Sequence, residues 1–188
     1  MSRRNAAPRI LSGRWKGRAL KVPKSARPTS SRAREALFDI LQDDVAGSRF
    51  LDLFAGSGAV GLEALSRRAS RVVFVEKDSA ALEANLSACG AQPEEHELLR
   101  EDARDAAATL SRHGETFDVV FADPPYAVKP AFSHSLAELL APGGKLVLQT
   151  DSAADPPNVA GLVSGARRAY GRNVFWFFER APADAPTD

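Results

Sequence analysis

The residues with the clearest chemistry lie in the stretch FDVVFADPPYAV, residues 117–128. The apolar run predicts a strand, so Asp123-Pro124-Pro125-Tyr126 follows a strand's carboxyl end, where ligands bind in an open α/β sheet. Consecutive prolines fix φ and donate no N–H group, so the Asp123 carboxylate and the Pro124 carbonyl form a rigid pair of acceptors. Such a pair suits the two N–H bonds of an exocyclic amine on a nucleobase. The Tyr126 ring can stack on that base, a contact worth about 1–3 kcal/mol.

An exocyclic amine needs this help because its lone pair is conjugated into the ring, which makes the nitrogen a poor nucleophile. Acceptors aimed at both N–H groups favour a pyramidal nitrogen and stabilise the positive charge that grows during methyl transfer. Asp123 needs no unusual basicity, since the methylated amine loses its proton readily. The structural alternative is a tight turn with no role in chemistry.

A second motif is the glycine loop in DLFAGSGAVGLEAL, residues 52–65. Residues 56–61 match G-x-G-x-x-G between a predicted strand and a predicted helix, and Glu76 ends the next strand. In a βαβ unit the glycines let the backbone approach an adenosine, and the acid accepts hydrogen bonds from the ribose hydroxyls. The motif alone leaves NAD, FAD and S-adenosylmethionine as candidates, beside a purely structural turn.

Asp52 favours S-adenosylmethionine among these ligands. A dinucleotide places a negative pyrophosphate at the amino end of the helix after the loop. An anion at the end of the strand would repel that group, but it suits the ammonium and sulfonium groups of S-adenosylmethionine. In the alternative interpretation, Asp52 only accepts hydrogen bonds from the amides of the loop.

Alternating strand and helix patterns place both motifs at one edge of a sheet. The predicted strands are 49–54, 71–76, 96–101, 117–122 and 144–149, and the predicted helices are 29–41, 59–68, 79–88, 103–112 and 131–140. This alternation predicts βαβ units, a mostly parallel sheet and helices on both faces. Residues 165–180 instead predict two strands that turn at 170–172 and form an antiparallel pair at the edge.

Charge is unevenly distributed along the chain. Residues 1–34 contain eleven of the 25 Lys and Arg and no Asp or Glu. A basic arm on an acidic body is typical of a protein that binds a polyanion, although a solvated tail is the alternative. Trp15 lies among these cations, and residues 10–11 and 20–22 on either side of it can pair as a short hairpin.

Composition excludes several other classes of protein. Cys89 is the only cysteine, so a disulfide framework and a CxxC metal site are excluded, and a reducing compartment is favoured. His96, His113 and His134 lack metal-ligand spacing, and we expect no metal. No apolar run approaches the ~20 residues that span a membrane, and the N-terminus lacks the apolar region of a signal peptide. We expect a cytoplasmic monomer.

The motifs and their surroundings resemble a known family. Residues 123–126 are similar to the [DNS]-PP-[YFW] motif of S-adenosylmethionine-dependent methyltransferases that methylate amino groups. More narrowly, the chain resembles the bacterial small-subunit (16S) ribosomal RNA guanine-N2 methyltransferases from about Arg9 to Arg180. The segments that carry this narrower resemblance are 9–23, 27–41, 50–67 and 72–78.

The resemblance implies a Rossmann-like class I methyltransferase fold, an α/β fold with a seven-stranded, mostly parallel sheet and an antiparallel C-terminal edge strand. Together with the charge distribution and the Ala-, Pro- and acid-rich end of the chain, it divides the chain into a basic RNA-binding arm (1–28), a methyltransferase domain (29–180) and a disordered tail (181–188). It further implies methyl transfer from S-adenosyl-L-methionine to the exocyclic N2 amine of a guanine in 16S rRNA. The expected partner is 16S rRNA within the 30S subunit or an assembly intermediate.

The expected site residues fall into three groups. The cofactor is expected against Asp52, Phe54, Ala55, Gly56, Ser57, Gly58, Glu76, Lys77, Asp102, Ala103 and Asp123, of which the resemblance implies 54–58, Glu76, Asp102 and Ala103. The resemblance assigns the target amine to Asp123, Pro124, Pro125 and Tyr126. RNA is expected at Arg9, Arg14, Trp15, Lys16, Arg18, Arg27, Thr29 and Arg32. One departure is that Gln149-Thr150 stands where family members commonly carry a glutamate, so no role is assigned there.

Four rival functions use parts of the same pattern. An adenine-N6 DNA methyltransferase or a glutamine-N5 protein methyltransferase would use the same acid-proline-proline-tyrosine motif. An NAD(P)-dependent oxidoreductase would use the glycine loop, and a non-catalytic RNA-binding assembly factor would use the basic arm. The motif at 123–126 favours methyl transfer, because neither hydride transfer nor passive binding needs it.

Overall fold

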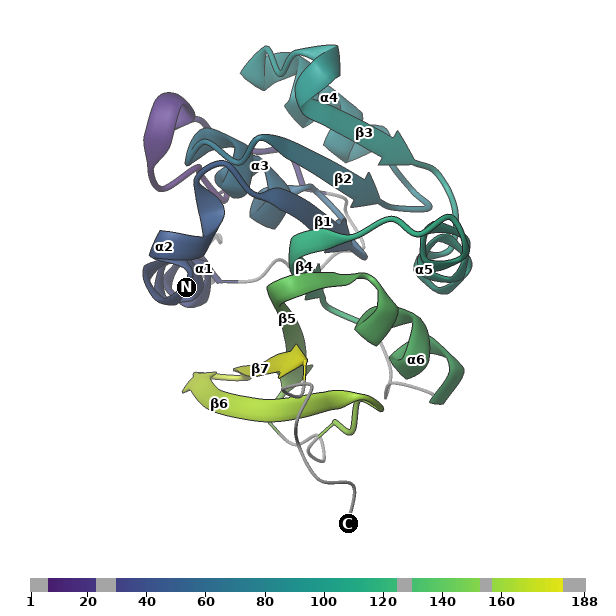
Figure 1. The fold of residues 1–188 in the computed structure, drawn as a ribbon. Coiled ribbons are helices and arrows are strands. Elements are labelled where there is room, and N and C mark those ends of the chain that lie inside the picture. The colour runs from purple at the N-terminus through teal and green to yellow at the C-terminus, as the bar shows by residue number, and fades with distance from the viewer. Residues whose placement is uncertain (1–6, 23–29, 125–129, 153–156, 181–188) are drawn as a thin grey trace.

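The computed structural model describes residues 7–22, 30–124, 130–152 and 157–180, and a seven-stranded sheet runs through them (Figure 1). The strand order is β3-β2-β1-β4-β5-β7-β6. The strands are β1 (Arg49–Leu53), β2 (Arg71–Val75), β3 (His96–Leu99), β4 (Phe117–Ala122), β5 (Leu140–Asp151), β6 (Leu162–Tyr170) and β7 (Asn173–Arg180). The neighbours among β1 to β5 are parallel, whereas β7 is antiparallel to both β5 and β6. The predicted parallel sheet with an antiparallel C-terminal pair is confirmed.

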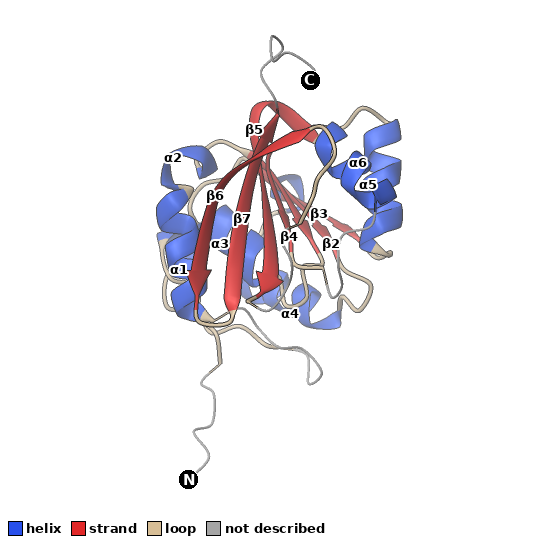
Figure 2. Ribbon diagram, turned by 90° about the horizontal axis from the view of Figure 1, so that it is seen from below, coloured by secondary structure: helices blue, strands red, loops and turns tan. Residues whose placement is uncertain are grey.

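Helices cover both faces of the sheet (Figure 2). The α-helices are α1 (Ser31–Ile40), α2 (Gln42–Val45), α3 (Ala59–Ser66), α4 (Ala80–Cys89), α5 (Ala103–Arg112) and α6 (Pro130–Glu138), with 3-10 turns η1 (Gly13–Trp15) and η2 (Pro93–Glu95). One apolar cluster contains side chains of α1, α3 and α4, and a second contains those of α5 and α6. Central strands such as β2 are therefore buried on both faces, which explains their continuous apolar runs.

The predicted helices and parallel strands agree with the observed ones to within two residues at most ends, and β5 is the exception. Ser30 caps α1, because its side chain accepts a hydrogen bond from Ala33 N at 3.1 Å. β5 begins at Leu140, four residues before the expected start, since Leu140 already pairs with Phe117 of β4. Residues 141–144, between the observed and the expected start of β5, include a proline and two glycines. Such residues are rare in strands, so sequence propensity does not predict this start.

The N-terminal segment, residues 7–22, packs on the domain. Ile10 N donates to Arg18 O at 2.9 Å, Leu20 N donates to Pro8 O at 2.8 Å, and a single antiparallel bridge joins Arg9 to Ala19. Ile10 and Leu20 are almost fully buried in the cluster with α1 and α3. The hairpin expected between residues 10–11 and 20–22 is reduced to one bridge, which lies one residue before each of these segments. This part of the arm is nevertheless packed and is not a solvated tail.

Within the described ranges, no helix is both long and apolar enough to cross a membrane. The same residues contain no group of His, Cys, Asp and Glu that could hold a metal ion. The expected tail at 181–188 lies outside the described residues.

Candidate active site

The glycine loop leaves β1 through a sharp turn and enters α3. Phe54, Gly56 and Gly58 all have positive φ, at 62°, 57° and 74°. A Cβ on Gly58 would lie 2.3 Å from Leu82 Cδ1, so this glycine also lets α3 and α4 approach each other. A Cβ on Gly56 would have no neighbour within 4 Å. The backbone at Gly56 is therefore open to a ligand, as the motif predicts.

Glu76 is tied to this loop by its carboxylate. Its Oε2 accepts a hydrogen bond from Gly56 N at 2.7 Å, and its Oε1 accepts one from Asp78 N at 2.9 Å. A carboxylate has about four lone-pair sites, so each oxygen keeps capacity for a further donor such as a ribose hydroxyl. The turn and the acid that follows β2 thus form one unit.

Asp52 is buried beneath the loop, with 1% of its surface exposed. Its Oδ2 accepts a hydrogen bond from Gly61 N at 2.8 Å. Burial raises the pKa of Asp52 to about 7 against the opposing Gly61 hydrogen bond, and the carboxylates of Asp123 and Glu76 raise it further. The hydrogen bond from Gly61 N agrees with the alternative interpretation, in which Asp52 only accepts hydrogen bonds from amides of the loop. The neighbouring carboxylates of Asp123 and Glu76, in contrast, favour the binding of a cation beside Asp52.

Asp123 meets the glycine loop at the same edge of the sheet. In the register, Leu53 pairs with both Ala122 of β4 and Val75 of β2, so the residues that follow these three strands are neighbours. Asp123 is partly buried, and Gln149 Nε2 donates to its Oδ2 at 3.1 Å. Burial raises the pKa of Asp123 to about 6. Pro125 and Tyr126 lie outside the described residues.

The other expected cofactor residues lie in the loop itself and beyond β2 and β3. Ala55 is partly buried, and Ser57 is buried with its carbonyl accepting from Asn85 Nδ2 at 2.8 Å. Asp102 caps α5, because its carboxylate accepts from Arg104 N at 2.9 Å. The Arg104 side chain lowers the pKa of Asp102 by hydrogen bonding, with a smaller effect from Lys77. Ala103 is buried and Lys77 is exposed.

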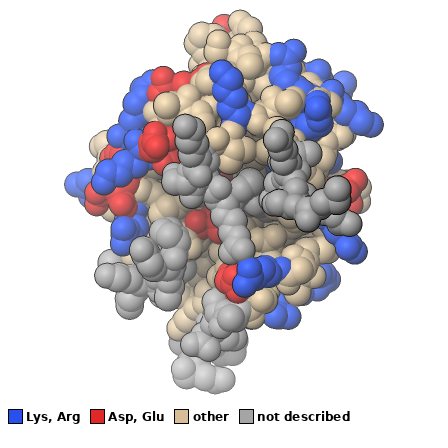
Figure 3. Space-filling model, turned by 180° about the vertical axis from the view of Figure 1, so that it is seen from behind, with Lys and Arg blue, Asp and Glu red and all other residues tan. Residues whose placement is uncertain are grey.

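The expected RNA-binding residues differ in their exposure. Lys16, Arg18 and Arg32 are exposed, and Figure 3 shows Lys and Arg around much of the outline of one face of the molecule. Arg9 is exposed as well, but its Nη1 donates to Gly17 O at 2.8 Å. Arg14 makes two hydrogen bonds to Glu95, at 2.7 and 2.9 Å. Arg27 and Thr29 lie outside the described residues.

Trp15, which is expected to contact RNA, has little exposed surface. Its ring is only 9% exposed and belongs to the apolar cluster with α1 and α3. The guanidinium carbon of Arg14 lies 4.1 Å from the centre of the ring. Trp15 therefore anchors the segment through packing, and its contact with RNA stays a prediction.

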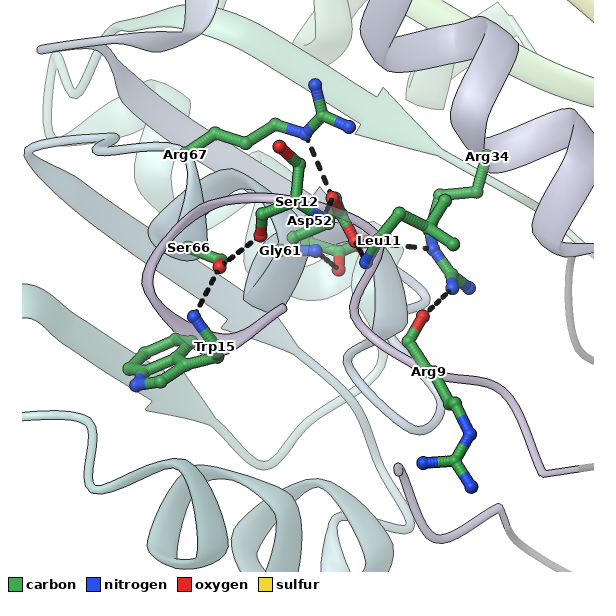
Figure 4. Close-up of polar contacts among 10 residues, drawn as sticks. Arg9, Leu11, Ser12, Trp15, Arg34, Asp52, Gly61, Ser66 and Arg67 are labelled. Atoms are coloured by element: carbon green, nitrogen blue, oxygen red, sulfur yellow. Dashed lines mark hydrogen bonds and ion pairs between the residues drawn. The ribbon is translucent and has the colours of Figure 1, made fainter. Parts of the chain in front are cut away.

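Sequence reasoning missed the polar residues that join the N-terminal segment to the site. Asn85 on α4 accepts from Lys21 N at 2.8 Å and donates to Lys21 O at 2.9 Å, in addition to its bond with Ser57 O. Glu63 on α3 accepts from Leu11 N at 2.7 Å and Ser12 N at 2.9 Å (Figure 4). Both are buried polar side chains on helices whose other buried residues are apolar apart from Ser66 of α3, and this interruption is the signal that the sequence gives of them.

The strand order and the glycine loop define the Rossmann-like fold of S-adenosylmethionine-dependent methyltransferases, whose cofactor is S-adenosylmethionine. The chain belongs to the family described as "Conserved hypothetical protein 95", whose model matches residues 8–179. It is 41% identical to ribosomal RNA small subunit methyltransferase D of Haemophilus influenzae over 123 residues, 63% of each chain.

Two further comparisons cover more of the chain. The putative rRNA methyltransferase YlbH of Bacillus subtilis is 34% identical over 174 residues, 87% of this chain and 94% of that protein. The structure of the putative methyltransferase yhhF of Escherichia coli is 31% identical with a TM-score of 0.79, over 92% of this chain and 97% of that one. The chain spans about 60–63% of the length of the first curated relatives that it matches.

Proposed function

We propose that the protein transfers a methyl group from S-adenosylmethionine to the exocyclic N2 amine of a guanine in 16S ribosomal RNA. The observation that carries the proposal is that Asp123 lies next to the glycine loop at the carboxyl edge of the sheet. Two relatives are named as ribosomal RNA methyltransferases, which supports RNA as the substrate. The guanine amine rests on the acid-proline-proline-tyrosine motif and on the resemblance to guanine-N2 methyltransferases.

The residues of the site fit S-adenosylmethionine. Asp52 and Asp123 both have raised pKa values with no cation among the described residues paired to either carboxylate. A bound cation would favour their ionised forms, and the open backbone at Gly56 beside Glu76 suits the adenosine. When bound, the cofactor supplies an electrophilic methyl group on a positively charged sulfur. We assign Lys77, Asp102 and Ala103 to the rim of the adenosine pocket.

Asp123 acts on the target amine through its position. With a pKa of about 6 its carboxyl is mostly ionised at neutral pH, so it accepts a hydrogen bond from one amine N–H. The Pro124 carbonyl, which follows directly along the chain, is proposed to accept the other. Together they orient the nitrogen lone pair and stabilise the positive charge that develops on the nitrogen. The proton of the methylated amine then leaves to solvent.

The basic N-terminal segment is proposed to contact the RNA backbone. Lys16, Arg18 and Lys21 are exposed. Lys21 N donates to Asn85, which also bonds to Ser57 of the glycine loop, whereas Trp15 N donates to Ser66 at the other end of α3. Phosphate contacts by such cations release counterions and make binding depend on salt. The target base would be splayed out of the RNA to reach Asp123. We infer a cytoplasmic monomer that acts on the 30S subunit or an assembly intermediate.

A transfer assay tests this proposal directly. Ribosomal particles from a strain that lacks the protein are incubated with cofactor labelled in its methyl group, and label in the RNA is counted. Asp123→Ala should lower the transfer rate by at least about 100-fold, the loss typical of one preorganised electrostatic contact. Its affinity for S-adenosylmethionine, measured by calorimetry, should stay within about tenfold. Asp39→Ala is the matched control, because Asp39 is exposed on α1.

Transfer by Asp123→Ala at the wild-type rate would contradict the proposed mechanism. In the same assay with DNA or protein supplied in place of the particles, label in either substrate would instead support the rival amino methyltransferases. Binding of NAD in place of S-adenosylmethionine would support an oxidoreductase. Cofactor binding without methyl transfer to any of these substrates would support the non-catalytic RNA-binding assembly factor.

A further inference from the structure

Gln149 lies against the acid loop, near the carboxyl end of β5, and its side chain is almost fully buried. Its Nε2 donates to Asp123 Oδ2 at 3.1 Å and to Asn173 Oδ1, on β7, at 3.3 Å. A carboxamide nitrogen carries two hydrogens, so these two acceptors use both of them. An ionised Asp123 can only accept, and the amide nitrogen must therefore face it.

Three strands hold this contact in place. Ala122 of β4 pairs with Leu148 of β5, and Gln149 pairs with Phe175 of β7. Alternate residues of a strand point to opposite faces, and the next side chain along, Thr150, accepts from Trp176 Nε1 at 3.0 Å. The position of Gln149 relative to Asp123 is thus set by sheet register and not by a flexible loop.

We infer that Gln149 is a positioning residue that holds the Asp123 carboxylate ionised and oriented toward the target amine. This inference rests on the proposed function. The terminal torsion of an aspartate is broad, so the carboxylate needs a partner to fix its plane. Among the described residues, no Lys or Arg forms an ion pair with Asp123.

A neutral donor suits this place better than a charged one. In the described part of the chain, the titratable groups linked to Asp123 are Asp52 on β1, which interacts with Asp123, and Glu76 after β2, which interacts with Asp52. A cation at position 149 would compete with the positive charge that Asp123 stabilises during transfer. A glutamate there would place two carboxylates about as close as the present 3.1 Å contact, and such a pair shares a proton.

Three variants separate positioning from a purely structural role. Gln149→Glu adds a carboxylate beside Asp123, Gln149→Leu removes the donor at similar volume, and Gln42→Glu adds the same charge at an exposed position on α2. The first readout is the titration of the Asp123 carboxyl carbon by NMR in the protein without cofactor, with the signal assigned from its absence in Asp123→Asn. The second is the pH profile of kcat for methyl transfer.

The pKa of Asp123 should rise in the order wild type, Gln149→Leu, Gln149→Glu. For Gln149→Glu we expect a rise of about one unit or more, a tenfold or larger change in proton affinity. The acidic limb of the kcat profile should move to higher pH by the same amount, and Gln42→Glu should leave both readouts unchanged. The NMR titration needs no substrate, so it holds or fails separately from the proposed function.

Two patterns of results would overturn the role of Gln149 in methyl transfer. If Asp123 titrates alike in the wild type and both Gln149 variants, while only their thermal stability falls, Gln149 is structural. If the titration shifts as expected but the wild type methylates no RNA, the hydrogen bond stands and the proposed function fails. If the shift in the titration leaves the kcat profile of an active enzyme unmoved, the bond does not serve transfer.

Discussion

A buried carboxylate, that of Glu63, holds one part of the N-terminal segment, and replacing Glu63 by glutamine should loosen the segment at residues 11 and 12. Glu63 is fully buried and accepts from Leu11 N, Ser12 N and Arg67 Nε, the last at 2.9 Å. Its Oε2 also lies 3.8 Å from Nε of Arg34, which is fully buried too (Figure 4). Glutamine keeps the volume of the side chain but removes its charge.

Glu63→Gln should lower the free energy of unfolding because the buried Arg34 loses its carboxylate partner. Its Nη2 donates to Arg9 O at 2.5 Å, whereas Nε and Nη1 have no hydrogen-bond partner among the described residues. Burial lowers the pKa of Arg34, and Glu63 is the group that opposes this effect. Removing one partner of a buried pair typically costs about 3–5 kcal/mol. For a chain of this size that corresponds to a fall in Tm of roughly 6–20 °C.

The assay is thermal and urea unfolding combined with amide hydrogen exchange. In Glu63→Gln, the amides of Leu11 and Ser12 should exchange faster than those of the central strands. Glu97→Gln is the matched control, since Glu97 and Arg71 form a 2.7 Å pair with nearly half of each side chain exposed. The control should cost less than about 1 kcal/mol. Equal costs for the two variants, or unchanged exchange at Leu11 and Ser12, would refute this account of the anchor.

Three further predictions concern the loop, the cofactor and the arm. Gly61→Ala should destabilise the protein by about 1–3 kcal/mol in urea unfolding, because the new Cβ would lie 2.3 Å from Phe74 Cε1; no loss would contradict the close packing of α3 on β2. Calorimetry in buffers of different ionisation enthalpy should detect proton release on binding S-adenosylmethionine near pH 7 but not at pH 9, because a cation lowers the raised pKa of Asp52; no release near pH 7 would place the cation elsewhere. Lys16→Gln/Arg18→Gln should weaken RNA binding and reduce the slope of log K against log salt by up to about 1.8, and an unchanged slope would remove the arm from the interface.

The fold and the two motifs were predictable because they depend on local pattern. Residues 72–75 of β2 and 119–122 of β4 are continuous apolar runs, since parallel strands are buried on both faces. Gly56 to Gly61 and Glu76 lie at the expected points of a βαβ unit. The adjacency of Asp123 and the loop then follows from the rule that strands of a parallel sheet end at one edge.

The remaining features depend on contacts between distant parts of the chain. Glu63 binds amides that lie about fifty residues earlier, and no periodicity marks such a pair. Trp15 resembles an exposed aromatic among cations until its ring is seen in the apolar cluster. The role of Gln149 depends on the register of β5 between β4 and β7. The longer β5 was missed because its first residues include Pro142, Gly143 and Gly144.

The central claim is that Asp123 presents an ionised acceptor to a guanine amine beside the bound methyl donor. Nucleoside mass spectrometry of small-subunit ribosomal RNA tests it most directly, using a strain that lacks the protein and is complemented with the wild type or with Asp123→Ala. The account predicts N2-methylguanosine at one site with the wild type and none at that site with Asp123→Ala. The same methylated guanine in both strains, or a methyl group that the wild type adds only to another base, would contradict it.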